Sequence, residues 1–196
     1  SCSLVGSEMC IRDRNKKLVK SSPKPIDTQA INRFILALPY KLTKDQTQAI
    51  REIVLDLMSP SLMYRLLQGD VGSGKTILAF LAMCLVADNG YQAALMAPTE
   101  VLARQHYEGF QKLMEEQNLS FPTVLLTGSD TAREKRLAYA KIASGEALVI
   151  IGTHALIQEK VEYANLALVI TDEQHRFGVE QRAALASKGQ NAHIYV

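Results

Sequence analysis

The chain has 196 residues, of which 47% are hydrophobic and 21% are charged, and its formal net charge is +2. These values are typical of one globular domain with a substantial hydrophobic core. No apolar run approaches the roughly 20 residues needed to span a bilayer, so we expect no membrane segment. The near-neutral charge neither requires nor excludes a nucleic-acid partner. Three cysteines without a CxxC pair indicate a reducing, cytoplasmic protein without a metal cluster.

The first stretch, "SCSLVGSEMCIRDR", lacks the periodicity of the rest of the chain and does not look native. With the basic run and the "SSPKP" segment that follow, it predicts a flexible lead-in over residues 1–22. Residues 23–45 then read as a linker and a helix that lead into the main domain, residues 46–196. Helical spacing covers 28–38 and stops before Pro39.

A second amphipathic helix follows in "LTKDQTQAIREIVLDLMS", with Thr43 as its expected N-terminal cap. Its spacing places five apolar side chains on one face: Ile50, Ile53, Val54, Leu57 and Met58. We therefore expect this face to pack against the main domain.

Beyond Pro60, short apolar runs alternate with helical stretches. The expected strands lie near residues 64–68, 92–98, 123–128, 147–153, 166–173 and 192–196. The expected helices lie near 75–89, 100–117, 132–143 and 180–186. This alternation predicts an α/β fold of three layers, with a mostly parallel sheet of about six strands between helices on both faces. Its crossovers should be right-handed.

One strand and one helix of this series enclose "GDVGSGKT", a complete G-x-x-x-x-G-K-[ST] motif. Its residues are Gly69, Asp70, Val71, Gly72, Ser73, Gly74, Lys75 and Thr76. The glycines allow a tight turn that points backbone N–H groups at phosphate oxygens, and the following helix adds its positive N-terminal end. A dinucleotide-binding fingerprint does not fit, because Ile77 occupies its third glycine position. The stretch is therefore predicted to bind a nucleoside triphosphate.

Within this loop, Lys75 is expected to reach the outer phosphates and Thr76 to offer its hydroxyl to Mg²⁺. The strand "LALVIT" ends in two acids, Asp172 and Glu173. The carboxyl ends of parallel strands share one edge, so these acids can meet the same nucleotide. We expect Asp172 to hold Mg²⁺ through water and Glu173 to orient or deprotonate the attacking water. His175, two positions after Glu173, is predicted to belong to the nucleotide-binding residues and to link the nucleotide state to a neighbouring domain.

At this point the motifs resemble those of a known family. "DEQH" at 172–175 is similar to the box of the DExH helicases of superfamily 2, and "LTKDQ" resembles their adenine-reading box, with Gln46 as its glutamine. "APTEVLARQH", "LLTGS" and "IGTHALIQ" resemble the strand-binding motifs in the expected order. Together with "DEQHRFGVEQR", these stretches most resemble the RecG-type ATP-dependent DNA helicases over about residues 31–196.

The resemblance implies a RecA-like P-loop NTPase domain that uses ATP and Mg²⁺ and acts on branched or single-stranded DNA in recombination and repair. It also implies a second RecA-like domain and a wedge domain as partners, a favoured monomer, and weak activity of the domain alone. For contacts with DNA phosphates it indicates five residues near strand ends: Thr99, Arg104, Gly128, Thr153 and His154. Such contacts ignore base sequence, as a translocating motor requires.

Three other classes of nucleotide-binding protein are alternatives to this interpretation. A double-strand translocase of the transcription-repair coupling type shares "RFGV", but typically has DEEQ at the acidic box and Tyr at the position of Ser73. A signalling GTPase would carry an N-K-x-D box after the phosphate loop, and the sequence has none there. A nucleotide-binding module with little turnover stays open for this chain alone.

Overall fold

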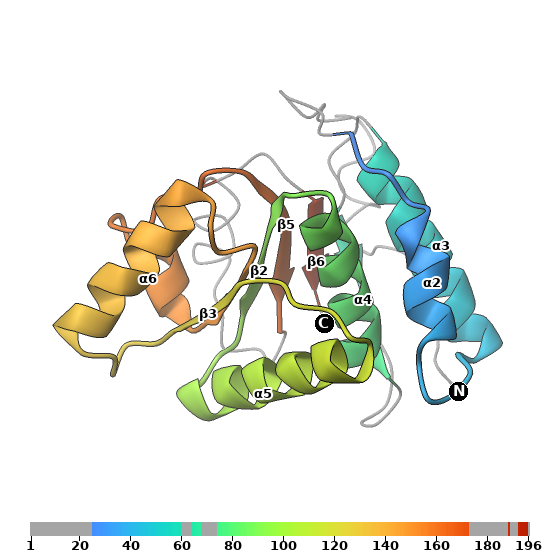
Figure 1. Cartoon of the computed structure of the whole chain (residues 1–196), viewed down its shortest axis with the longest axis horizontal. Coiled ribbons are helices and arrows are strands. Elements are labelled where there is room, and N and C mark those ends of the chain that lie inside the picture. The colour runs from blue at the N-terminus through green and yellow to red at the C-terminus, as the bar shows by residue number, and fades with distance from the viewer. Residues whose placement is uncertain (1–24, 60–63, 68–73, 173–187, 189–191, 196) are drawn as a thin grey trace.

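Figure 1 shows the chain as a computed structural model, which describes residues 25–59, 64–67, 74–172, 188 and 192–195. The predicted helix over 180–186 lies outside these residues. Within them, no helix combines the length and apolarity that crossing a membrane requires.

Six strands form one sheet at the centre of the molecule: β1 (Tyr64–Leu66), β2 (Gln92–Met96), β3 (Thr123–Leu126), β4 (Val149–Gly152), β5 (Leu166–Thr171) and β6 (Ala192–Tyr195). Their order is β1-β6-β5-β2-β4-β3, and every neighbouring pair is parallel. Met96 at the end of β2 pairs with Gly152 on one side and with Thr171 on the other. The carboxyl ends of these strands are therefore level, and the parallel sheet that the sequence predicts is confirmed.

The described helices are α2 (Ala30–Leu36), α3 (Lys44–Met58), α4 (Lys75–Asp88), α5 (Glu100–Glu116) and α6 (Ala132–Ser144), with a short 3₁₀ turn η1 (His154–Ile157). α2 and α3 lie at the opposite end of the molecule from α6, with α4 and the sheet between them (Figure 1).

Two hydrophobic cores lie on the two faces of the sheet, because successive side chains of a strand point to opposite faces. Ala93 and Leu95 of β2 join the larger core, which also contains side chains of α2, α3, α4 and α5. Ala94 and Met96 join the smaller core, with side chains of α6 and the η1 turn. The arrangement is thus the predicted three-layer α/β/α sandwich.

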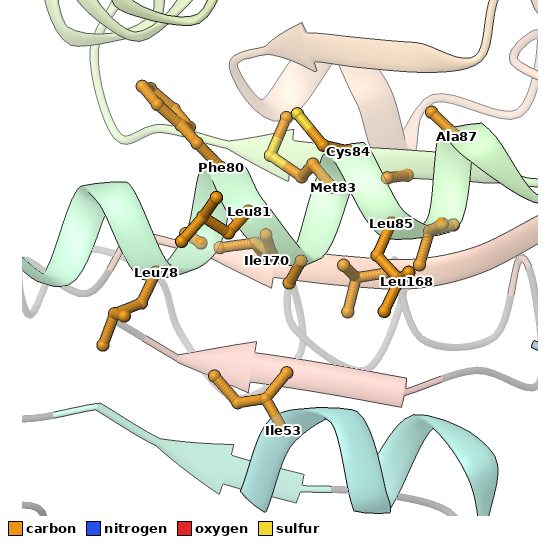
Figure 2. Close-up of a cluster of buried hydrophobic side chains, with 14 of the residues drawn as sticks. Ile53, Leu78, Phe80, Leu81, Met83, Cys84, Leu85, Ala87, Leu168 and Ile170 are labelled. Carbon is orange, nitrogen blue, oxygen red and sulfur yellow. The ribbon is translucent and has the colours of Figure 1, made fainter. Parts of the chain in front are cut away.

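Helix α4 is buried on all sides. Figure 2 shows Leu81 and Leu85 lying toward Ile170 and Leu168 of β5, whereas Met83 points to the opposite side of the helix. Every residue from Leu78 to Ala87 is buried. Burying one such leucine stabilises the fold by about 1.5–3 kcal/mol relative to leaving it in water, so α4 and its neighbours form the rigid centre of the domain.

Helix α3 begins as the sequence predicts. The Thr43 side chain accepts a hydrogen bond from the backbone N–H of Gln46, and the Gln46 side chain accepts one from the backbone N–H of Thr43. Its buried face is narrower than predicted: Ile53 is fully buried, but Met58 is 55% exposed. Met58 stands in the last turn, one position beyond the buried stripe that ends at Leu57, so its predicted place in the core was wrong.

Candidate functional site

The nucleotide-binding motif ends at the first turn of α4. Gly74 is the N-terminal cap in the left-handed conformation, with φ of 82°, and Lys75 and Thr76 are the first helical residues. The left-handed backbone explains the glycine, because a Cβ is strained there. Lys75 thus belongs to the first turn of α4, at the helix end whose N–H groups and dipole favour an anion. The preceding motif residues, Gly69 to Ser73, lie outside the described residues.

Gln46 lies directly against this turn. A Cβ added to Gly74 would collide with the Gln46 amide nitrogen. The amide oxygen of Gln46 accepts a hydrogen bond of 2.9 Å from the backbone N–H of Thr43, and the residue is only 8% exposed. Two residues predicted to bind nucleotide, Gln46 and Gly74, are therefore brought together from different parts of the chain.

Asp172 follows β5 directly, at the carboxyl edge of the sheet where the sequence predicts it. Its backbone N–H donates a 2.9 Å hydrogen bond to the carbonyl of Met96. Its side chain is held as well, because Oδ2 lies 2.9 Å from Nε2 of His106 on α5. The other predicted residues of this box, Glu173 and His175, lie outside the described residues.

The loops predicted to contact DNA lie along the same edge. The backbone N–H of Ala97 donates to the carbonyl of Gly152 at 2.8 Å, and that of Thr153 donates to the carbonyl of Leu126 at 3.2 Å. These bonds join the segments that follow β2, β4 and β3, so Thr99, Gly128 and Thr153 come from neighbouring loops. Phosphate contacts along one strand require such a row of loops.

Side-chain exposure separates these candidates. Thr99 caps α5 by accepting a 3.3 Å hydrogen bond from the backbone N–H of Leu102. Gly128 and His154 are exposed. Thr153, by contrast, is only 4% exposed, and its hydroxyl accepts from the backbone N–H of Ala155. In this arrangement Thr153 shapes the turn that presents His154.

Arg104 belongs to a polar network that the sequence did not predict. Its guanidinium donates to Glu100 at 2.9 Å, and the same carboxylate accepts a 2.6 Å hydrogen bond from Ser129 after β3. The hydrogen bond from Ser129, followed by that from Arg104, lowers the pKa of Glu100. Lys135 of α6 donates to the carbonyl of Gly128 at 3.0 Å. The bond from Ser129 to Glu100 connects the start of α5 to the β3–α6 loop.

A cavity of about 380 Å³ lies beside the first turns of α4, and its lining includes Tyr40, Thr76, Phe80 and Lys112. It adjoins the predicted phosphate site through Thr76. No sequence pattern predicts this cavity, because its walls come from three separate segments of the chain.

The donor set near α4 fits Mg²⁺. This ion prefers oxygen ligands and keeps several waters, so one carboxylate, one hydroxyl and the nucleotide phosphates suffice. Asp172 Oδ1 makes no hydrogen bond to any described residue, and Thr76 is exposed. Within the described part of the chain no cluster of three or more His, Cys, Asp or Glu side chains offers a protein-only metal site.

The sequence pattern of the DEAD/DEAH box helicases matches residues 43–192, which is most of the chain. The fold and the edge described above are thus those of a helicase domain, and the chain belongs to the DEAD/DEAH box helicase family.

More specific similarities lie within that family. The chain is 55% identical over 159 residues to the ATP-dependent DNA helicase RecG of Streptococcus pneumoniae, covering 81% of the chain and 23% of that protein. It is 46% identical over 182 residues to RecG of Aquifex aeolicus, covering 93% and 23%. A solved structure of RecG bound to a three-way DNA junction superposes with a TM-score of 0.79 at 40% identity, covering 94% of this chain and 24% of that one. The chain thus spans about a quarter of the length of these relatives.

Proposed function

We propose that the chain is the first RecA-like motor domain of a RecG-type DNA helicase. In this function it binds ATP with Mg²⁺ and couples hydrolysis to movement on branched DNA in recombination and repair. A second RecA-like domain and a wedge domain would complete the motor. The observation that carries the proposal is the shared carboxyl edge: the Asp172 backbone bonds to the end of β2, and the loops after β2, β3 and β4 continue along the same edge.

The roles of the nucleotide-site residues follow from their chemistry. Lys75 and the N-terminus of α4 neutralise phosphate charge, and Gln46 borders the loop from the base-reading motif. Asp172 and Thr76 would hold Mg²⁺, which would offset the charge of the outer phosphates. Glu173 would orient the attacking water. The fixed Asp172 carboxylate requires little rearrangement when nucleotide arrives, which is the basis of electrostatic preorganisation.

The roles of the DNA residues follow from their place on the edge. The exposed helix N-terminus at Thr99 and the exposed backbone of Gly128 can donate N–H groups to phosphates. Arg104 is 50% exposed in its side chain and adds positive charge beside them. His154 extends the row after β4. Such contacts read the backbone and not the bases, as movement along any sequence requires.

The proposal is tested by measuring nucleotide and DNA binding on this chain and on a longer polypeptide that contains the second domain. A labelled three-way junction should bind both, with affinity that falls steeply as salt rises. ATP hydrolysis by the longer polypeptide should rise strongly when the junction is added. Hydrolysis that is indifferent to DNA, or a chain that prefers GTP, would contradict the proposal.

A matched pair of arginines sharpens the test. Arg104→Gln should weaken junction binding several-fold and make its salt dependence shallower. Arg51→Gln, on the exposed surface of α3 at the opposite end of the molecule from α6, removes the same charge and serves as the control. Equal losses for the two variants would show that overall charge, and not this edge, attracts DNA.

A further inference from the structure

We propose that His106 is a positioning residue for the nucleotide site, because it holds the Asp172 carboxylate and ties that carboxylate to helix α5. This inference rests on the proposed function, since Asp172 is assigned there to Mg²⁺. The motif that contains His106 predicts strand binding and gives this side chain no role of its own. Its partner in space lies 66 positions further along the chain.

The geometry defines which atom does the holding. Nε2 of His106 stands 2.9 Å from Oδ2 of Asp172, and a carboxylate can only accept, so the proton of the imidazole must be on Nε2. Both side chains are 16% exposed, so water competes weakly for the bond. The bond engages one carboxylate oxygen and leaves Oδ1 for the water shell of the metal ion.

The imidazole also has an aromatic neighbour. The ring of Phe80 on α4 meets it edge-on, with centroids 6.3 Å apart and planes at 87°. Phe80 in turn meets Phe110 of α5 at 5.5 Å and 74°. These edge-to-face contacts fix the ring plane of His106 against both helices. A fixed ring can orient a carboxylate, which a mobile surface histidine cannot do.

Asp172 is thereby fixed at two points. Its backbone N–H bonds to β2 through the carbonyl of Met96, and its side chain bonds to α5 through His106. Of these, only the bond to His106 restricts the rotation of the carboxylate. In metal sites, partners that orient a ligand in this way typically change metal affinity by about 10–100-fold when they are removed.

The same bond connects the proposed nucleotide site, at Asp172, to helix α5, whose N-terminus lies among the proposed DNA contacts. Helix α5 begins after Thr99, and His106 follows seven positions later, about 10 Å along the helix axis. A shift of the α5 N-terminus on binding DNA would therefore move the group that holds Asp172. By linkage, nucleotide and DNA affinities then depend on each other through His106.

Two substitutions separate positioning from packing. His106→Phe keeps a ring against Phe80 but removes the donor. His106→Gln keeps an N–H donor at a similar reach from the backbone. Glu108→Gln, on the exposed face of the same helix, is the control. A fluorescent ATP analogue is titrated into the full 196-residue chain over a series of Mg²⁺ concentrations and in EDTA, and thermal unfolding verifies that each variant is folded.

For His106→Phe we expect the Mg²⁺ concentration at half-maximal nucleotide binding to rise about tenfold, with little change in EDTA. The Mg²⁺ midpoint of His106→Gln should stay within about threefold of the wild-type value. The midpoint of Glu108→Gln should equal the wild-type value. A midpoint for His106→Phe equal to that of the wild type would overturn the proposal. A wild-type chain that binds no nucleotide would instead contradict the proposed function, so the two failures are distinguishable.

If His106→Phe does not fold, His106→Asn replaces it, because its shorter side chain cannot reach Asp172. The Mg²⁺ midpoint should then rise for His106→Asn and not for His106→Gln, and equal midpoints of these two variants would overturn the proposal.

The link to α5 is tested by a separate measurement. Single-stranded DNA should shift the Mg²⁺ midpoint of the wild type and leave that of the donor-free variant unchanged. A DNA response that is absent in the wild type, or that survives in the variant, would contradict the link.

Discussion

Helices α4 and α5 both begin at the carboxyl edge of the sheet, but they are built for different tasks. Ten of the 14 residues of α4 are buried, whereas only four of the 17 residues of α5 are. α4 is therefore packed on all sides from Leu78 to Ala87, which makes its N-terminus a rigid base for the proposed phosphate site. α5 packs on one face, around Phe110, and leaves Glu100 and Arg104 toward solvent. Burial thus makes the proposed phosphate site rigid, whereas the proposed DNA edge needs an exposed polar face.

The largest expected effect tests the burial of α4. Leu81→Asp places an unpaired carboxylate at a fully buried position and should cost about 5 kcal/mol or more, enough to unfold the chain. Val101→Asp introduces the same charge on α5, where the residue is 66% exposed, and should change stability by about 0.5 kcal/mol or less. Urea unfolding followed by circular dichroism measures both. Comparable losses would show that the two helices do not differ in burial.

A second comparison concerns the two ends of α4. Gly74 and Gly90 both have positive φ, of 82° and 79°. Gly74→Ala should strain the backbone and collide with Gln46, whereas Gly90→Ala meets nothing within 4 Å and should cost only the strain of about 1–2 kcal/mol. We expect Gly74→Ala to be the more destabilising of the two and to weaken nucleotide binding. Equal unfolding midpoints would contradict the close contact with Gln46.

The start of α5 should show a smaller loss. Thr99→Ala removes the side-chain acceptor for the N–H of Leu102 and should lower the free energy of unfolding by about 1 kcal/mol. Thr99→Ser keeps the acceptor and serves as the control. On α6, Thr131 forms a full capping box with Glu134, so Thr131→Ala should cost a similar amount. If Thr99→Ala has no effect on the urea midpoint, the cap does not stabilise α5.

Helix α4 should also show a response to alkaline pH. Burial, with a smaller contribution from Asp88, raises the pKa of the Cys84 thiol from 9.0 to about 12. Because the folded pKa lies above the unfolded one, this contribution to stability is complete below about pH 9 and is lost as pH rises toward 12. Between pH 9 and 11 the urea midpoint of the wild type should therefore fall more than that of Cys84→Ala. Parallel curves would contradict the buried thiol.

Glu100 on α5 should respond in the opposite direction. Its lowered pKa gives stability that is present above its ordinary value of 4.5 and is lost as pH falls. The group is exposed, so we expect only a slight effect. Helix α4 thus carries a buried thiol that titrates at high pH, and helix α5 carries a surface carboxylate that titrates at low pH.

Much of the fold could be predicted because it depends on local patterns. Six apolar runs correspond to six strands, and the predicted cap Thr43 marks the start of α3. Asp172 could be placed at a strand end because acid and strand are adjacent in sequence. Met58 was misplaced because the helical period alone does not show where the packing surface ends.

The contacts that could not be predicted join distant segments. Gln92 is fully buried in β2, where its side chain donates to the carbonyls of Ile142 and Ala147 and accepts from the N–H of Asn165. The residues near Gln92 in the sequence give no indication that its side chain has three hydrogen-bond partners 50 or more positions away. The pairing of His106 with Asp172 likewise depends on β2 lying beside β5, and strand order is a property of the whole sheet.

The most direct test of the central claim is nucleotide binding at the start of α4. A fluorescent ATP analogue is titrated with Mg²⁺ into the wild-type chain and into Lys75→Ala, with Lys160→Ala, exposed and remote from the phosphate loop in sequence, as the control. We expect saturable binding that unlabelled ATP displaces, a loss of affinity of at least about tenfold for Lys75→Ala, and no change for the control. Equal affinity of Lys75→Ala and the wild type would contradict the assignment of this edge as a nucleotide site.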